Sequence, residues 1–330
     1  MPRLHRRALP RLLAAALPAP LLPPRSAGAQ SGWPGERPIQ IIVPFPPGGG
    51  TDVNLRAMVP HFERHLPGAR FVVVNRPGAG AEIGYTAAAQ AAPDGYTIGT
   101  VITPSLQTIT IERQPRYRLE DFAYLGTVVS DPSGLHVAPE GPIRTLADLL
   151  SRARENPGGI AVGTSGIGSD DHLLMLALEE AAGIRLNHIP FAGQAPTVTA
   201  LLGGHIQVAS MNMGESVALI REGRIRPLAS ASAERFPMTP EVPTFRELLG
   251  RPIEMGVVRS LVVPAATPAA IRQRLSQMLA DTMQDPAWIA EAARLFVPLH
   301  YLSAEETRAL IFREAEALRA LWRRRPWRDA

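Results

Sequence analysis

The chain has 330 residues with no cysteine and no lysine, and its formal net charge is +4. Residues 1–29 carry five arginines and no acidic residue, so the remainder has a formal net charge of −1, and the basic excess does not indicate nucleic-acid binding. The lack of cysteine excludes thiol catalysis, cysteine–zinc sites and a lipid anchor on an N-terminal cysteine. A chain of this length suggests two domains.

The N-terminus has the pattern of an export signal. Basic residues between Arg3 and Arg11 precede the apolar stretch 12–22, which is too short to span a bilayer. The small residues around Ala29 predict a signal peptide over residues 1–29 and a periplasmic location. A disordered cytosolic tail is the alternative, and the export route, general or twin-arginine, is left open.

The first half of the remaining chain alternates strand and helix patterns. Strands are expected at 39–43, 71–74 and 97–102, and helices at 51–66 and 81–91. This alternation predicts an α/β fold with a parallel sheet. Residues 125–137 follow as extended segments that are expected to break at Asp131-Pro132-Ser133-Gly134.

A second strand–helix series indicates a second, smaller lobe. Its expected helices are 146–155, 170–182 and 196–202, and its expected strands are 160–163, 188–191 and 206–210. A strand at 225–230 would return the chain to the first lobe, and amphipathic helices are expected at 267–284 and 304–319. The predicted division is residues 37–132 and 227–330 for lobe 1 and residues 133–226 for lobe 2.

Two glycine-rich turns stand between an apolar strand and a helix. The first, Ile39–Asp52, reads IQIIVPFPPGGGTD, and the second, Ile160–His172, reads IAVGTSGIGSDDH. Each places backbone N–H groups at a helix N-terminus, which favours anion binding, although a rigid turn without a ligand is the alternative. The first turn lacks the lysine of a phosphate-binding loop and the spacing of a dinucleotide fingerprint. Two such turns from separate halves could hold a small molecule with two anionic ends.

The second turn also offers a candidate nucleophile. Ser165 lies near His172, but Ile167 replaces the last glycine of the G-x-S-x-G nucleophile elbow. A periplasmic hydrolase using these two residues therefore remains an alternative. Asp170 and Asp171 are poorly spaced for a metal site, and acidic residues are common in the first turn of a helix. His172 is interpreted either as a packing residue or as a ligand contact.

Further polar residues follow the predicted strands. Asn75, Thr103 and Ser105 lie at the carboxyl ends of first-lobe strands, where open α/β sheets bind ligands. Asn75 either contacts a ligand or braces the loop. In the second lobe, Phe191 and Gly193 follow a strand and could supply an apolar wall and a close backbone approach.

Together these stretches resemble the periplasmic solute receptors of tripartite tricarboxylate transporters, the Bug family. The matching stretches are RPIQIIVPFPPGGGTD, VVVNRPGAGAEIG, APDGYTIGT, TSGIGSDDHL, HIPFAGQAP, LLGGHIQV and EVPTF. The resemblance implies a two-lobed, type II-like Venus-flytrap fold that closes on a small di- or tricarboxylate or related organic acid. It further implies delivery to a membrane permease, with no catalytic step, cofactor or metal, and we expect a monomer.

Carried over residue by residue, the resemblance implies a ligand-binding set in both lobes. The set comprises Phe45, Gly49, Gly50, Thr51, Asp52, Asn75, Thr103, Thr164, Ser165, Gly166, Ser169, His172, Phe191 and Gly193. The chain departs from the family at Ala192, at Met211 with its neighbours Ser210 and Asn212, and at Val258 with Arg259. The loss of an acidic residue and the gain of Arg259 favour a more anionic or less amine-bearing ligand. A sensor that feeds a membrane kinase is the other alternative.

Overall fold

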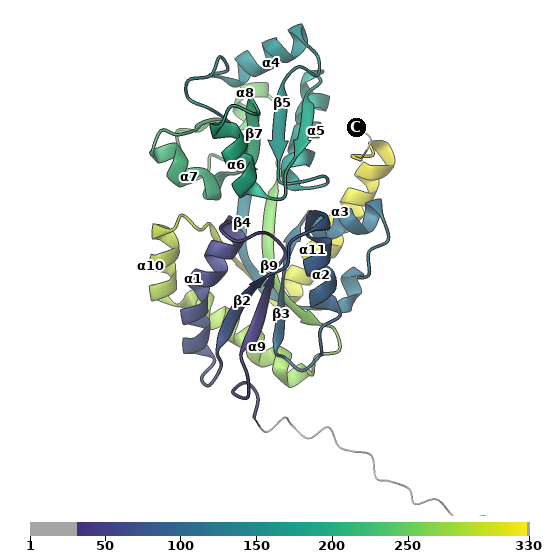
Figure 1. Ribbon diagram of the computed structural model, residues 1–330, viewed down its shortest axis with the longest axis vertical. Helices are drawn as coiled ribbons and strands as arrows, with labels where there is room; N and C mark the ends of the chain where they lie inside the picture. The colour runs from purple at the N-terminus through teal and green to yellow at the C-terminus, as the bar shows by residue number, and fades with distance from the viewer. Residues whose placement is uncertain (1–31, 329–330) are drawn as a thin grey trace, which may run out of the picture. The chain divides into compact units, whose positions relative to one another are not determined.

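Two strands, β4 (Phe122–Val137) and β9 (Gly256–Pro264), run through the centre of the structure (Figure 1). The computed structural model describes residues 32–328, and the predicted signal peptide lies outside them. β4 pairs with β9 up to Pro132, and from Ser133 onward it pairs with β7 (Val208–Asn212) and β8 (Arg226–Ser230). β4 therefore belongs to two groups of strands, which we call the first and second lobes.

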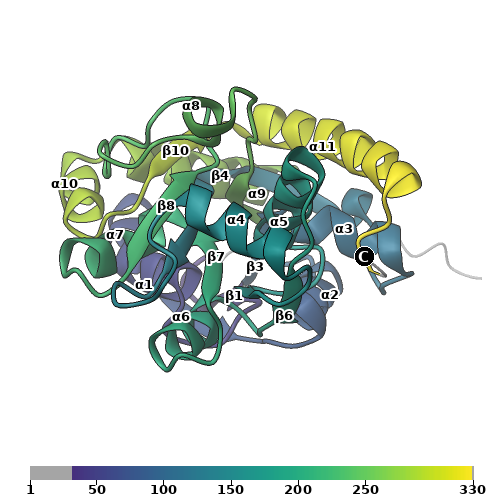
Figure 2. The ribbon, with the colours of Figure 1, turned by 90° about the horizontal axis from the view of Figure 1, so that it is seen from above.

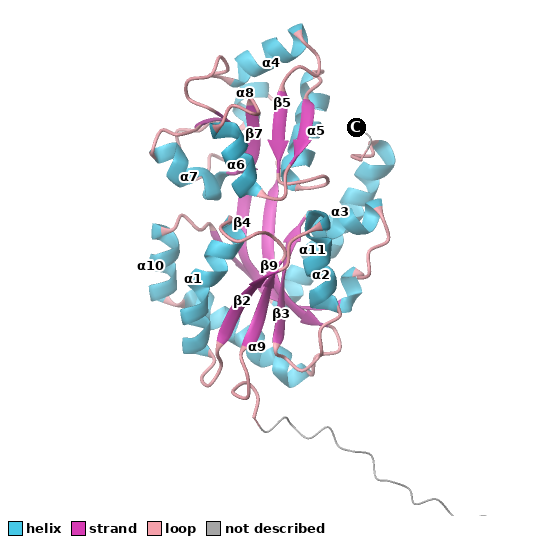
Figure 3. Cartoon of the chain, viewed as in Figure 1, coloured by secondary structure: helices cyan, strands magenta, loops and turns pink. Residues whose placement is uncertain are grey.

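The first lobe is an α/β layer structure. Its strands follow the order β2-β1-β3-β9-β4, in which β1 is parallel to β2 and β3, and β9 is antiparallel to β3 and β4. Figure 3 shows strands and helices of this lobe side by side. The other first-lobe elements are β1 (Ile39–Val43), α1 (Gly50–His65), β2 (Phe71–Asn75), the 3₁₀ helix η1 (Ala79–Ala81), α2 (Glu82–Ala89), β3 (Thr97–Thr103), α3 (Ser105–Glu112), the 3₁₀ helix η2 (Leu119–Asp121), α9 (Ala269–Gln284), α10 (Pro286–Arg294) and β10 (Leu299–Leu302).

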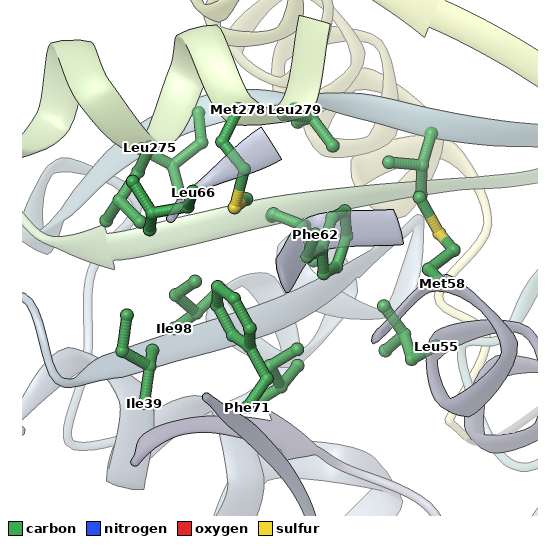
Figure 4. Packing of buried hydrophobic residues seen from close by; sticks show 14 of the residues in the cluster. Ile39, Leu55, Met58, Phe62, Leu66, Phe71, Ile98, Leu275, Met278 and Leu279 are labelled. Atoms are coloured by element: carbon green, nitrogen blue, oxygen red, sulfur yellow. The ribbon is translucent and has the colours of Figure 1, made fainter. Parts of the chain in front are cut away.

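The apolar run of β1 is buried on both faces, as a strand between two helical layers requires. Ile39 and Ile41 pack in one cluster with Phe62 of α1 and Met278 of α9 (Figure 4). Ile42, which points to the opposite face, packs in a second cluster with residues of α2 and α3. The predicted α/β character of this half is confirmed.

The second lobe is smaller and has the strand order β4-β7-β5-β6. Its other elements are α4 (Leu146–Glu155), β5 (Ala161–Thr164), α5 (Asp170–Ala182), β6 (Asn187–Pro190), α6 (Gln194–Leu202), α7 (Met213–Arg221) and α8 (Phe245–Leu249). The bounds of α4 and α5 match the sequence prediction. The local signals are strong there, because Thr145 and Asp148 form a capping box before α4 and Ser169 caps α5.

The break expected at Asp131-Pro132-Ser133-Gly134 is absent, because these residues lie inside β4. A proline is tolerated here because β4 changes partner at this point, from β9 to β7. In the neighbouring strand β9, Gly256 lets the backbone of β4 approach closely at this point. A Cβ atom on Gly256 would come within 2.5 Å of the backbone oxygen of Asp131. The segment that was expected to break is therefore a continuous strand that connects the lobes.

β8 was expected to return the chain to the first lobe, but it pairs with the second half of β4. Phe245 of α8 and Ile253 then pack in the same apolar cluster as the second-lobe strands. Residues 227–255 thus pack with the second lobe rather than with the first. The return is made by β9, a strand that the sequence analysis did not identify.

The C-terminal helix α11 (Ala304–Arg324) contacts both lobes (Figures 1 and 2). Ile311 packs in a first-lobe cluster with residues of α2 and α3, whereas Leu318 and Trp327 pack in the second-lobe cluster. Arg325 donates a 2.6 Å hydrogen bond to the backbone oxygen of Leu176 in α5. Together with β4 and β9, this helix therefore joins the two lobes.

Candidate functional site

A pocket with about 570 Å³ of empty space lies between the lobes. The first turn and β3, α3 and β9 supply one wall, and the second turn, the segment before α6 and the start of α7 supply the other. The lining residues are Phe45, Pro46, Gly49, Gly50, Thr51, Ile102, Ser105, Ser165, Asp170, Ala192, Gly193, Gln194, Ala195, Pro196, Asn212, Glu215, Val257 and Arg259. Six of the fourteen predicted ligand-binding residues are among them: Phe45, Gly49, Gly50, Thr51, Ser165 and Gly193.

The first turn presents the N-terminus of α1 to this pocket. Gly49 is the N-cap and adopts an extended conformation, and its lack of a side chain leaves the first turn without a side-chain cap of its own. Gly50 and Thr51 follow, and the amides of the first helical turn have no intrahelical acceptor. The helix dipole adds a partial positive charge at this point. This wall therefore favours an anionic group, as the sequence predicted.

Asp52 and Asn75 brace the first turn from behind and do not line the pocket. Asp52 accepts hydrogen bonds from the Gly48 amide (2.9 Å), from Arg56 (3.0 Å) and from Asn75 Nδ2 (2.9 Å). Asn75 also donates to the backbone oxygen of Phe45 at 3.0 Å. Burial acts to raise the pKa of Asp52, but these hydrogen bonds outweigh it and hold the pKa below its usual value. Asn75 therefore makes the bonds of a brace, and its contact with a ligand stays a prediction.

Arg259 of β9 is the cation of the pocket, and its side chain is 4% exposed. Its Nε donates to Thr51 Oγ1 at 3.2 Å and its Nη2 donates to Asn212 Oδ1 at 3.3 Å. The same Nη2 forms an ion pair with Glu215 of α7. Arg259 therefore connects the first turn to the second lobe.

Carboxyl groups surround this single arginine. Asp131 Oδ2 lies 3.6 Å from Arg259 Nη1, and Asp131 Oδ1 accepts from the Gly214 amide at 2.7 Å. Burial raises the pKa of Asp131 to about 7, although Arg259 acts to lower it. Burial also raises the pKa of Asp170, against hydrogen bonds from Ser133 (2.5 Å) and Asn212 (2.7 Å).

The second turn does not offer the open amides that the sequence predicted. The Ser165 amide donates to Asp171 Oδ2 at 3.2 Å, the Gly166 amide to Thr164 Oγ1 at 3.3 Å, and the Gly168 amide to His172 Nδ1 at 3.2 Å. Side chains of the turn and of α5 thus accept the hydrogen bonds of these three amides. Only Ser165 and Asp170 of this segment reach the pocket wall. The two turns therefore differ in how their amides are bonded, and anion binding at the second turn stays a prediction.

Ser165 and His172 are not paired as a nucleophile and its base. Ser165 Oγ donates to Asp171 Oδ2 at 2.6 Å, and the His172 ring stacks on His188 with centroids 3.8 Å apart. Burial, together with the neighbouring His188, lowers the pKa of His172 to about 3, so the ring is neutral at pH 7. This geometry provides no activated hydroxyl.

The other predicted residues do not line this pocket. Thr103 Oγ1 accepts from the Val258 amide at 3.2 Å, and Thr164 Oγ1 bonds His188 Nε2 at 2.7 Å. Ser169 caps α5, and Phe191 packs against an apolar cluster of the second lobe. Gly166 accepts a 2.8 Å hydrogen bond from Ser169 Oγ through its backbone oxygen. These contacts hold the second-lobe turns in shape.

The sequence analysis missed Glu215 as a pocket residue. It noticed Arg259 and Asn212 only as departures from a family pattern, although both line the pocket. Of the remaining departures, Ala192 lines the pocket, whereas Met211 and Val258 do not. The signal that could have found Glu215 is its position just after β7, since second-lobe strands also carry ligand-contacting residues at their carboxyl ends.

Two α/β lobes that are joined by two long strands and border one pocket define a two-lobed solute-binding protein. The family described as "Tripartite tricarboxylate transporter family receptor" matches residues 58–325. The chain belongs to this family. The protein BugT of Bordetella pertussis (strain Tohama I) is 33% identical over 284 residues, which cover 85% of this chain and 86% of BugT.

Solved structures share the fold. The periplasmic binding protein BugD superposes with a TM-score of 0.80 at 28% identity, over 88% of this chain and 97% of that chain. An R. palustris protein solved with adipate superposes with a TM-score of 0.79 at 28% identity, over 88% and 96% of the two chains. The α/β periplasmic-binding-protein fold expected from the sequence is confirmed. Within residues 32–328, no helix has both the length and the apolar character needed to cross a membrane.

Proposed function

We propose that the chain is a periplasmic receptor that binds a small di- or tricarboxylate, or a related carboxylate, between its lobes and delivers it to a tripartite-type membrane permease. The observation that carries the proposal is Arg259, a buried cation beside the N-terminus of α1 in the pocket between the lobes. An arginine and a helix N-terminus both favour a carboxylate group. The related R. palustris structure with adipate supports the same ligand class.

Binding would act through hinge closure. Both lobes line the pocket, and the strands that connect them are β4 and β9. A ligand that contacts both walls stabilises the closed arrangement over the open one and shifts the population toward it. The receptor performs no chemical step in this proposal, and it acts as a monomer that presents its closed form to the permease.

Carboxylates are expected to raise the melting temperature of the exported protein, purified without the residues of the predicted signal peptide. The probes are adipate, malate and citrate, and the matched control is adipamide, which has the length of adipate without its charges. A ligand that binds only the folded protein adds about 2.7 kcal/mol of stability at a hundred times its Kd. Differential scanning fluorimetry gives the shift, calorimetry gives Kd, and mass spectrometry of the recovered probe checks that it is unchanged.

Two results would contradict the proposal. In the first, adipamide stabilises the protein as much as adipate does, which would mean that charge is not recognised. In the second, the recovered carboxylate is chemically altered, which would indicate an enzyme.

A further inference from the structure

The carboxylate of Glu215 already lies where the proposed function places a ligand carboxylate. Glu215 is near the start of α7 in the second lobe and pairs with Arg259 Nη2. A Cβ atom built on Gly50, the first residue of α1, would overlap the carboxyl group of Glu215. A carboxylate of the protein itself therefore packs against the N-terminus of α1 and pairs with Nη2 of Arg259.

The donors of Arg259 that face the pocket are committed to protein groups. Nε bonds Thr51, and Nη2 is shared between Asn212 and Glu215. Nη1 makes no hydrogen bond within the described residues. The acidic group beside it is Asp131, whose Oδ2 lies 3.6 Å away. A ligand anion that approached Nη1 would be repelled by Asp131 when that group is ionised. A ligand carboxylate therefore gains the most favourable interaction with Arg259 at Nη2, the atom that Glu215 covers.

Glu215 has space into which it can move. Its side chain is 12% exposed, and it lines both the pocket described above and a second pocket with about 920 Å³ of empty space. Gly49, Gly50, Gln194 and Ala195 also line both. Glu215 thus borders two spaces, and the second one gives its side chain room to leave Arg259.

We propose that Glu215 is an internal competitor for the ligand carboxylate and a specificity-determining residue of the pocket. The inference rests on the proposed function. A ligand carboxylate binds between Arg259 and Gly50 by displacing the Glu215 side chain, and the lost ion pair lowers the affinity for every carboxylate that uses this position. Because Glu215 comes from the second lobe and Gly50 from the first, the pair also holds the two walls together before ligand binds.

The first experiment compares wild type, Glu215→Gln and Glu222→Gln by calorimetry with adipate and adipamide. Glu222 ends α7 at the surface and is 56% exposed, so its variant makes the same charge change outside the pocket. We expect Glu215→Gln to bind adipate at least about tenfold more tightly than wild type, since close charge pairs couple by this much or more. Glu222→Gln and the adipamide measurements should match wild type.

Equal or weaker adipate binding by Glu215→Gln, alongside binding by wild type, overturns the inference and leaves the proposed function standing. Weaker binding would mean that Glu215 supports adipate binding instead of competing with it.

A second experiment does not depend on the identity of the ligand. Glu215→Ala removes the internal carboxylate, and added acetate is expected to restore several degrees of melting temperature relative to sodium chloride at equal ionic strength. Wild type and Glu222→Gln should show no such difference between the two salts. If no carboxylate binds wild type, the proposed function fails, and the acetate effect alone decides whether this position accepts a carboxylate. Absence of that effect overturns the inference.

Discussion

Arg259→Gln is expected to abolish carboxylate binding and to reduce the free energy of unfolding by about 3–5 kcal/mol. The reason is that Arg259 is 4% exposed and stands among three carboxyl groups, those of Glu215, Asp131 and Asp170. Removing the cation leaves these groups buried without an opposite charge, which costs more than the ion pair itself contributes. Urea unfolding at pH 7.5 measures the stability, and calorimetry with adipate measures the binding.

Arg246→Gln is the matched control, since this arginine is 55% exposed and its partner Glu254 is 50% exposed. Exposed pairs of this kind contribute little, so its unfolding curve should overlay that of wild type. The double variant Arg259→Gln/Glu215→Gln should regain part of the lost stability, because one buried charge is removed, but it should not regain binding. A stable Arg259→Gln variant would show that the carboxyl groups do not depend on this cation.

Local sequence signals predicted the first wall of the pocket well. The run of three glycines after β1 can have few roles other than a close backbone approach, and the structure places Gly49 and Gly50 at the pocket. The bounds of α4 were equally clear, because Thr145, Asp148 and Asn156 mark its two ends. Such features depend on neighbours within a few residues, and the sequence shows those neighbours directly.

The other wall depends on contacts that no local pattern encodes. Arg259 and Glu215 are 44 residues apart and meet only because β9 and α7 converge at the connection between the lobes. The second turn looked like a copy of the first, yet Asp171 and His172 of the following helix satisfy its amides. Whether a turn binds a ligand thus depends on which side chains fold back onto it, and this is a tertiary property.

The two turns differ in the origin of the carboxylate that lies against them. In the second turn a carboxylate of the same segment, Asp171, accepts from the Ser165 amide and hydroxyl, and it is buried. At the first turn the carboxylate belongs to Glu215 of the other lobe, and this side chain lines two pockets. The first arrangement is a fixed part of the fold, whereas the second can be exchanged for a ligand.

Asp131→Asn is expected to become more stable relative to wild type as the pH rises from about 4 to 7. Burial raises the pKa of Asp131 to about 7 in the folded protein, from its ordinary value of 3.8. Between these two values the folded wild type holds a proton that the unfolded chain has lost, so its stability falls with rising pH by up to about 1.4 kcal/mol per pH unit. The asparagine variant has no such proton and does not show this fall.

The measurement is the difference in free energy of unfolding between variant and wild type, taken from urea unfolding at several pH values. Buried histidines act in the opposite direction, because burial lowers the pKa of His136 and His188 to about 4, but they are present in both proteins and cancel in the difference. Asparagine can still accept from the Gly214 amide, so the structural bond at this position is kept. A flat difference for Asp131→Asn would mean that Arg259 holds Asp131 ionised throughout, and the pocket would then carry one more negative charge that any ligand carboxylate must overcome.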